Sequence, residues 1–258
     1  MASKTQQYWD KAAETKPLSN LVSSLQTFLT KTDAFQRASK SSLYREKWPQ
    51  TLIQKGIRTF GDLQQLPYTT AEEYSQAVIE HPHETLFCSN DIVIWYSTSG
   101  TSGEPKWYPQ TPMDVETRKE NRLRLNCLMN MKKDDRVFAI VAPPPFITSP
   151  GPAYFWRELR QQGYNIETLM TSYYDVEPAA RFAIKRNPTV IAGLPALIAR
   201  LGEAITEKAG GTLTPKDVYP SLERGVLGGD FLNPCRKTVE DEFGIEAYDI
   251  FGMTESLF

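Results

Sequence analysis

The sequence predicts an α/β fold in which a helical N-terminal lead-in is followed by a mostly parallel sheet with flanking helices. Up to about residue 85 the chain follows a helical pattern and is rich in Lys, Gln, Ser and Thr. Beyond that point, short apolar runs alternate with amphipathic stretches. This alternation is typical of parallel strands that are joined by covering helices. We therefore expect a helical subdomain over residues 1–84 and an α/β core over residues 85–258.

The individual elements follow from the spacing of the apolar residues. In the N-terminal part, the candidate buried positions are Trp9, Leu18, Leu21, Leu25, Phe28 and Leu29. The apolar run at residues 92–96 predicts a strand, and a helix is expected after Pro112. Further strands are predicted at residues 136–142, 165–170, 189–192, 223–227 and 246–251, and helices at residues 154–161, 177–185, 195–207 and 234–243.

Composition narrows the function classes. The chain has 258 residues, of which 40% are apolar, and this is enough to bury a substantial core. A net charge of −2 favours neither nucleic acid nor an anionic membrane, and no apolar stretch reaches the length of a membrane span. We expect no nucleic-acid or membrane partner and, without a signal peptide at the polar N-terminus, a cytoplasmic location. Three widely spaced cysteines and two histidines predict reduced thiols and no structural metal.

A run of hydroxyl and glycine residues that ends in a lysine predicts a phosphate-binding loop. The run comprises Thr98, Ser99, Gly100, Thr101, Ser102, Gly103 and Lys106. Glycines let the backbone approach an anion closely, hydroxyls add hydrogen-bond donors, and the lysine adds a positive charge. The spacing excludes the Walker loop and the G-x-G-x-x-G pattern. The alternative is a flexible Ser/Gly linker, which the flanking strand and the Pro-Lys ending disfavour.

Residues 98–106 resemble the T-S-G-T-[ST]-G-x-P-K signature of the adenylate-forming superfamily of acyl-CoA synthetases. The segment from Tyr248 to Glu255 resembles the Y-G-x-T-E segment of that superfamily, with Phe251 in place of the usual tyrosine. Between them, residues 193–195 and 228–230 fall where the superfamily has a carboxylate-pocket and an adenine-pocket segment. Within the superfamily, the chain looks most like phenylacetate-CoA ligase and coenzyme F390 synthetase.

The resemblance implies roles for individual residues. Residues 98–103 and Lys106 would hold the β- and γ-phosphates of ATP, Thr254 would bond the α-phosphate, and Glu255 would hold Mg²⁺. Phe251 would stack on adenine. The implied nucleotide site also includes Gly228, Gly229, Asp230, Asp249 and Gly252, and the implied acyl pocket consists of Phe146, Gly193, Leu194 and Pro195.

Each of these residues also has a purely structural alternative. Phe251 fits a core position on a strand, and Thr254 fits a helix N-cap. Glu255 alone would be a surface acid, and residues 228–230 fit an ordinary strand-to-helix turn. The aromatic and proline residues of the implied acyl pocket fit helix–sheet packing equally well.

The expected function is that of an ATP-dependent ligase that activates a small carboxylic acid, such as an aryl acid, as an adenylate and then transfers it to CoA. The T-G-D aspartate and the lysine-bearing C-terminal domain of complete relatives do not occur in these 258 residues. We therefore expect at best weak activity, and the alternative is a non-catalytic nucleotide-binding or assembly module. A strand at 246–251 that ends the sheet would be a sticky edge. The expected partner there is a second copy or a complementary C-terminal polypeptide.

Overall fold

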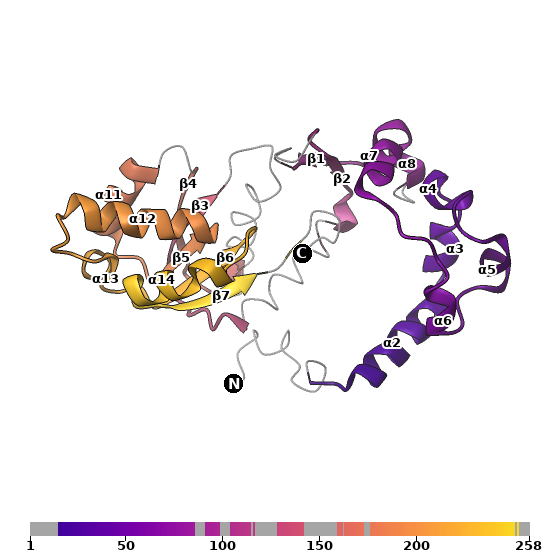
Figure 1. Cartoon of the computed structure of the whole chain (residues 1–258), viewed down its shortest axis with the longest axis horizontal. Coiled ribbons are helices and arrows are strands. Elements are labelled where there is room, and N and C mark those ends of the chain that lie inside the picture. Colours follow the sequence, from indigo (N-terminus) through magenta and orange to yellow (C-terminus); the bar gives the residue numbers. More distant parts are fainter. Residues whose placement is uncertain are drawn as a thin grey trace. The chain divides into compact units, whose positions relative to one another are not determined.

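The structure of the chain is a computed structural model (Figure 1). It describes residues 15–85, 91–98, 104–114, 116, 128–141, 159–161, 163–172, 176–250 and 252. The described residues fall into two compact units, one within Asp10–Val115 and the other within Glu116–Phe258. Each unit is described separately below. The domain boundary expected near residue 85 stays a prediction.

The first unit is mainly helical. Its helices are α2 (Leu18–Lys31), α3 (Ala34–Ala38), α4 (Ser42–Arg45), α5 (Gln50–Lys55), α6 (Phe60–Leu63), α7 (Ala71–Glu80) and α8 (Pro82–Thr85). A small core forms where the rings of Phe35 and Trp48 stack with centroids 4.9 Å apart. The ring of Tyr44 stacks on the same indole at 4.5 Å. These aromatic contacts join α3 and α4 to the turn before α5.

Helix α2 corrects one expectation about the core. Leu18, Leu21, Leu25 and Phe28 share a stripe at helical spacing, as predicted, but their side chains are 41 to 76% exposed. Leu29 is half-buried, and Trp9 lies outside the described residues. The expectation that the four residues are buried is wrong for the structure as described. The apolar period shows which residues share a face, but another element must cover that face to bury it.

A two-stranded antiparallel hairpin completes the first unit. It pairs β1 (Ile94–Ser97) with β2 (Trp107–Gln110). In this register Tyr96 lies opposite Tyr108, and the ring of Tyr108 stacks on Tyr74 of α7 at 5.4 Å. The sequence pattern predicts β1 but not β2, because a proline inside a four-residue run argues against a strand. Pro109 is tolerated here because a strand of a two-stranded sheet has one side without a ladder.

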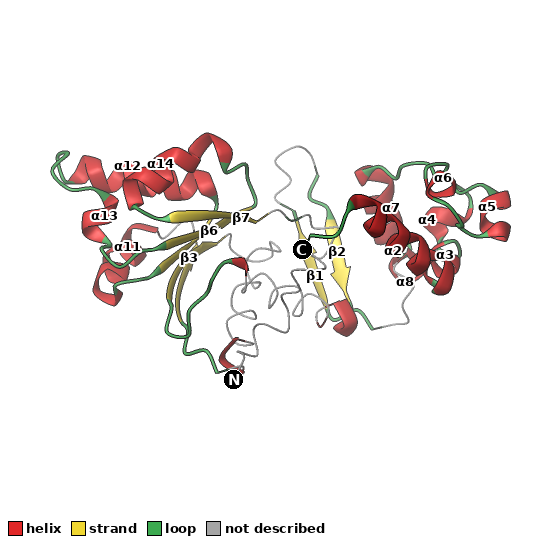
Figure 2. Ribbon diagram, turned by 90° about the horizontal axis from the view of Figure 1, so that it is seen from below, coloured by secondary structure: helices red, strands yellow, loops and turns green. Residues whose placement is uncertain are grey.

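The second unit contains the parallel sheet that the sequence predicts (Figure 2). Its five strands follow the order β4-β3-β5-β6-β7, and every neighbouring pair is parallel. The strands are β3 (Arg136–Val141), β4 (Glu167–Ser172), β5 (Val190–Gly193), β6 (Arg224–Gly228) and β7 (Glu246–Ile250). The described helices of this unit are α11 (Val176–Arg186), α12 (Pro195–Lys208), α13 (Pro215–Val218) and α14 (Asn233–Phe243). The predicted α/β class is confirmed, and the boundaries predicted for these five strands and for α11, α12 and α14 agree to within two residues. The helix predicted at residues 154–161 lies largely outside the described residues.

The sheet buries side chains on both faces. On one face Phe138 and Ile140 of β3 pack with Ile198 of α12 and Phe243 of α14. Figure 2 shows α11, α12 and α14 together on this side of the sheet. On the other face Val137 belongs to a second cluster, which includes Met129, Met131, Leu159 and Tyr164. Burial on both faces explains why residues 137–141 of β3 form an unbroken apolar run in the sequence. None of the described helices is both long and apolar enough to cross a membrane.

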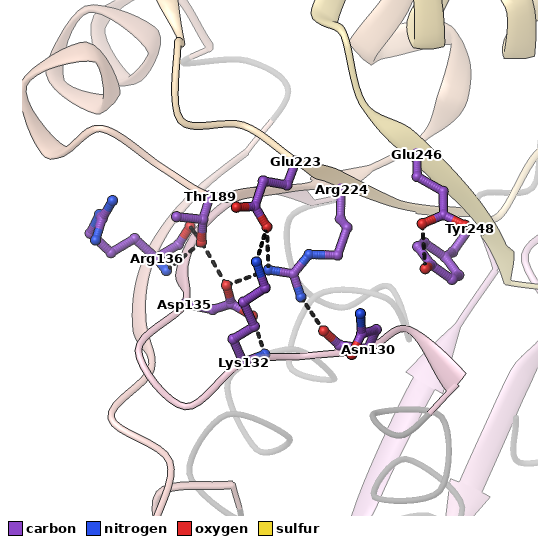
Figure 3. Close-up of polar contacts among 9 residues, drawn as sticks. All are labelled: Asn130, Lys132, Asp135, Arg136, Thr189, Glu223, Arg224, Glu246 and Tyr248. Carbon is purple, nitrogen blue, oxygen red and sulfur yellow. Dashed lines mark hydrogen bonds and ion pairs between the residues drawn. The ribbon is translucent and has the colours of Figure 1, made fainter.

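A buried ion pair joins the amino-terminal ends of three strands (Figure 3). Arg224, the first residue of β6, places Nη2 2.6 Å from Oδ1 of Asp135, which directly precedes β3. Their side chains are 3% and 1% exposed. Thr189, just before β5, donates its hydroxyl to the same carboxylate oxygen at 2.8 Å. The guanidinium also donates to the carbonyl oxygen of Asn130.

Glu242 of α14 is an acid whose charged form is disfavoured, at the place where α12 packs on α14. Burial raises the pKa of Glu242 above its ordinary value, and the nearby Glu203 carboxylate raises it further. A Cβ atom at Gly202 would lie 2.5 Å from Oε2 of Glu242, so the helices approach closely at this point. The carboxylates of Glu203 and Glu242 therefore repel each other at neutral pH, at a point where α12 and α14 are closely packed.

We predict that Asp135→Asn destabilises the chain by about 3 kcal/mol, because it leaves the buried Arg224 cation without its buried counter-charge. Among the described residues, only the half-exposed carboxylate of Glu223, 3.6 Å away, then remains. Urea unfolding followed by circular dichroism measures the loss. Arg181→Met is the control, because Arg181 pairs with Glu177 on the surface with 66% and 60% exposed side chains. That change should cost less than about 1 kcal/mol. Equal losses in the two variants would contradict the role of the buried pair.

We predict that Glu242→Gln stabilises the chain at pH 7, by about 0.5 kcal/mol, through relief of the repulsion from Glu203. Because the folded-state pKa is raised, the wild-type chain loses stability as pH rises through that pKa. The advantage of the variant should therefore vanish below about pH 4, where the carboxyl is neutral in both states. Thermal unfolding across pH measures it, with the exposed Glu207→Gln as control. A gain that does not depend on pH would refute the explanation.

Candidate functional site

Three of the segments that the sequence singles out meet at one edge of the parallel sheet. Gly193 is the last residue of β5, Gly228 is the last of β6, and Asp249 is the last residue but one of β7. The register places Gly193 beside Leu227, and Gly228 beside Ile250. Because the strands are parallel, their carboxyl ends share one edge. In open α/β sheets this edge is where ligands bind.

The backbone at this edge is tightly packed around glycines. A Cβ atom at Gly228 would lie 2.5 Å from the carbonyl oxygen of Ile250 on the neighbouring strand. Gly229 has a φ of +88°, and a Cβ atom there would lie 2.9 Å from Cδ2 of Leu194. Positive φ and this close approach both require glycine. The segments after β5 and β6 therefore touch each other directly, through Leu194 and Gly229.

The remaining described residues of this edge differ in exposure. Asp230, Asp249 and Gly252 are exposed, and Leu194 is partly buried. Pro195 is buried as the first residue of α12, a position where its missing N–H costs no hydrogen bond. The carboxylate of Asp230 accepts a hydrogen bond from the N–H of Phe231 at 2.7 Å. Pro195 therefore has a packing role at the start of α12, whereas the other residues leave polar groups accessible.

Phe231 is a feature of this edge that the sequence patterns do not single out. Its side chain is 84% exposed, although it directly follows the Gly-Gly-Asp turn. Only its place next to Asp230 could have drawn attention to it, because a phenylalanine in a strand-to-helix turn is usually buried.

In the first unit, the base of the predicted phosphate loop is held by two hydrogen bonds. The N–H of Thr98 donates to the carbonyl oxygen of Lys106 at 3.0 Å. The N–H of Lys106 donates to the hydroxyl oxygen of Thr98, also at 3.0 Å. The first bond extends the β1–β2 ladder by one residue pair, and the second joins the same pair through the Thr98 side chain. The loop is thus a hairpin connection that starts and ends on ordered strands, which is how functional loops are commonly supported.

The side chain of Lys106 has an acidic neighbour. Its Nζ lies 3.8 Å from Oε1 of Glu72 on α7, and the two side chains are 28% and 82% exposed. The Thr70 and Glu73 capping box marks the start of α7. A capping box of this kind can be found in a sequence, but the partner of Glu72 is far away along the chain. Sequence reasoning therefore missed Glu72.

The other predicted site residues lie outside the described residues. They are Ser99, Gly100, Thr101, Ser102, Gly103, Phe146, Phe251, Thr254 and Glu255. Within the part of the chain that the structure describes, no group of three or more His, Cys, Asp or Glu residues could hold a metal ion. The expected Mg²⁺ ligand, Glu255, is outside that part. The roles of all these residues stay predictions.

An open depression in the described surface lies at the opposite edge of the sheet, where the strands begin. It is lined by residues at the amino-terminal ends of β3 and β4, including Arg136, Arg160 and Asn165. Its lining residues lie at the starts of the strands, whereas the carboxyl edge lies where the strands end. Residues 142–150, which follow β3, are not among the described ones. We therefore treat the carboxyl edge and the base of the predicted phosphate loop as two separate candidate regions, one in each unit.

Comparisons with solved structures identify the fold. The chain is similar to a 2-hydroxyisobutyryl-CoA ligase that was solved in an open conformation with 2-HIB-AMP and CoA, with a TM-score of 0.78 and 18% identity. The match covers 99% of this chain and 58% of that chain. The postadenylation state of that ligase with 2-HIB-AMP matches with a TM-score of 0.80 and 18% identity, over 99% of this chain and 53% of that one. The thioesterification state matches with a TM-score of 0.79 and 19% identity, over the same shares.

No family model matches the sequence, and no curated protein matches it. The chain spans a little over half the length of the ligase structures that it resembles. At this level of identity the likeness concerns the fold, because one fold can carry several functions. The chain therefore has the fold of the matched part of an acid–CoA ligase that forms an acyl adenylate.

Proposed function

We propose that the chain binds ATP and a small carboxylic acid as part of an ATP-dependent acid–CoA ligase, which forms an acyl adenylate and then a CoA thioester. One observation carries the proposal. The segments at residues 193–195, 228–230 and 248–252 come to one edge of three adjacent parallel strands. They do so in a fold that is shared over 99% of the chain with a ligase bound to 2-HIB-AMP and CoA.

The chemistry requires positive charge near the phosphates. An anionic carboxylate must approach an anionic triphosphate, so the site has to neutralise phosphate charge and hold the reacting atoms in line. In the proposed arrangement Lys106 and the hydroxyls of residues 98–102 bind the leaving phosphates, and Thr254 bonds the α-phosphate. Glu255 would hold Mg²⁺, which supplies further positive charge when it is bound. Phe251 offers adenine an apolar stacking face without a phenolic hydroxyl.

For the acid we propose a phenylacetate-type aryl carboxylate. Leu194, partly buried against Gly229, offers an apolar wall at the carboxyl edge of the sheet. Gly193, Pro195 and Phe146 complete the proposed acyl pocket. The other candidate function is nucleotide binding without catalysis. It would need the predicted nucleotide residues but not the acyl pocket, and the buried Pro195 at the start of α12 also fits a packing role.

We predict that the 258-residue chain binds Mg²⁺–ATP with a Kd in the millimolar range, because the phosphate loop is present but the ribose-binding aspartate is not. Isothermal titration calorimetry measures the affinity. Lys106→Ala should weaken binding about tenfold, since it removes a charged contact to phosphate. Lys40→Ala, at an exposed lysine of the same unit, should leave the affinity unchanged. The absence of ATP heat from a folded chain would count against the phosphate site.

We predict no measurable phenylacetate-dependent exchange of labelled pyrophosphate into ATP by the 258 residues alone. A barrier that is higher by about 1.4 kcal/mol makes the reaction tenfold slower. We expect the loss of two catalytic groups to cost several such factors. The same assay on a longer chain that contains these residues, with Glu255→Gln as the impaired variant, distinguishes a ligase from a binding module. Robust exchange by the 258 residues would show that the site is complete without the two groups.

The outer side of the end strand β7 also suggests a protein partner. Among the described strands, β7 lies at one end of the sheet, so its outer side has no paired strand there. We propose that it pairs with a second copy or with a complementary C-terminal polypeptide. Light scattering of the 258-residue chain should show a mass that rises with concentration. A constant monomer mass over a wide concentration range would contradict association through this edge.

A further inference from the structure

The side chain of Lys106 is directed toward helix α7. Lys106 directly precedes β2, and its backbone bond to Thr98 continues the ladder. It is two residues from Tyr108, so the two side chains project from the same face of the hairpin. Tyr108 stacks on Tyr74 of α7, and Lys106 lies 3.8 Å from Glu72, two residues earlier on that helix. The two contacts run in the same order along the strand and the helix. The lysine is thus held on the side of the hairpin that packs against α7.

The main chain of Lys106 is fixed, whereas its side chain is free to change partners. Two hydrogen bonds to Thr98 hold its backbone at the base of the loop. Its side chain is a flexible four-carbon stem with a point charge at the end. From one fixed Cα position, the ammonium can therefore contact either the start of α7 or an anion above the loop base.

Glu72 is an anion that stays charged. Its carboxylate bonds its own backbone N–H, and this bond lowers its pKa below the ordinary value. The neighbouring Lys106 and the Thr70 side chain lower that pKa further. Glu72 is 82% exposed, and exposed ion pairs are weak because water screens them. A polyphosphate that carries several negative charges is a stronger partner for a lysine than one exposed carboxylate.

We propose that Glu72 is a positioning residue, which holds the Lys106 ammonium against α7 until the polyphosphate of a nucleotide replaces Glu72 as the partner of the lysine. The inference rests on the proposed function, because it requires that Lys106 binds phosphate. Glu72 competes with the nucleotide, so it lowers the affinity for polyphosphate. It also offers the lysine a partner when the polyphosphate leaves, which favours release.

A purely structural role for Glu72 makes a different prediction. An acid in the first turn of a helix is stabilised by the positive end of the helix dipole. If this were its whole purpose, replacing Glu72 would lower the melting temperature and leave phosphate affinity unchanged. If Glu72 competes for Lys106, replacement changes the affinity, and the change disappears when Lys106 is also replaced.

The test uses inorganic tripolyphosphate and Mg²⁺–ATP as probes and the 258-residue chain as the protein. Glu72→Gln should bind tripolyphosphate about threefold more tightly than wild type, as expected for loss of one weak, exposed ion pair. Lys106→Ala should weaken binding, and the double variant should bind like Lys106→Ala alone. Glu80→Gln removes the same charge at the far end of α7 and should change nothing, which controls for net charge.

A spectroscopic measurement tests the exchange of partners directly. Carboxyl carbon chemical shifts give the pKa of Glu72 as pH is varied. Saturating tripolyphosphate should raise this pKa in the wild-type chain, because the lysine leaves and an anion approaches. In Lys106→Ala the pKa should already be raised without ligand, and tripolyphosphate should change it less.

The two proposals fail in different ways. If the folded wild-type chain binds neither probe, the phosphate site is wrong and the inference falls with it. If wild type binds and Lys106→Ala weakens binding, but Glu72→Gln leaves the affinity within experimental error of wild type, the phosphate site stands and the role of Glu72 is overturned. A tighter affinity in Glu80→Gln equal to that in Glu72→Gln would also overturn it, because the effect would then come from net charge.

Discussion

The buried pair of Arg224 and Asp135 is the constraint on which the geometry of the sheet depends. A single carboxylate accepts hydrogen bonds from Arg224 and from Thr189, and it lies directly before β3. The amino-terminal ends of β3, β5 and β6 are therefore fixed in register with one another. The three strands are only four to six residues long, so alignment at their amino ends also sets the alignment of their carboxyl ends.

This alignment has an energetic cost and a consequence for the site. Removing two charges from water is expensive, and an apolar pair would often be as stable. We interpret the pair as a device for register, because a slip by one residue would turn every side chain of a strand to the other face. The contact between Leu194 and Gly229 at the opposite edge depends on that register. The site segments are thus positioned from the far end of the sheet.

The base of the predicted phosphate loop is held in a different way. It lies on a two-stranded hairpin, where Thr98 and Lys106 continue the pairing and α7 packs against one face. A lysine with a fixed backbone and a weak acidic partner combines a defined position with freedom of the side chain. At 18% identity the shared fold does not carry such details, so they must be argued from the residues themselves.

The α/β class could be predicted from the sequence, because strands buried on both faces appear as apolar runs between amphipathic helices. The sequence also predicts a phosphate loop and singles out the segments at 193–195 and 228–230, where glycines stand at strand ends. It did not show β2, where Pro109 obscures a short strand. Three features became visible only in the folded chain: the α2 stripe remains exposed, Arg224 is buried, and Lys106 lies near Glu72. Each of these depends on what a distant segment covers or neutralises, and local periodicity carries no information about distant segments.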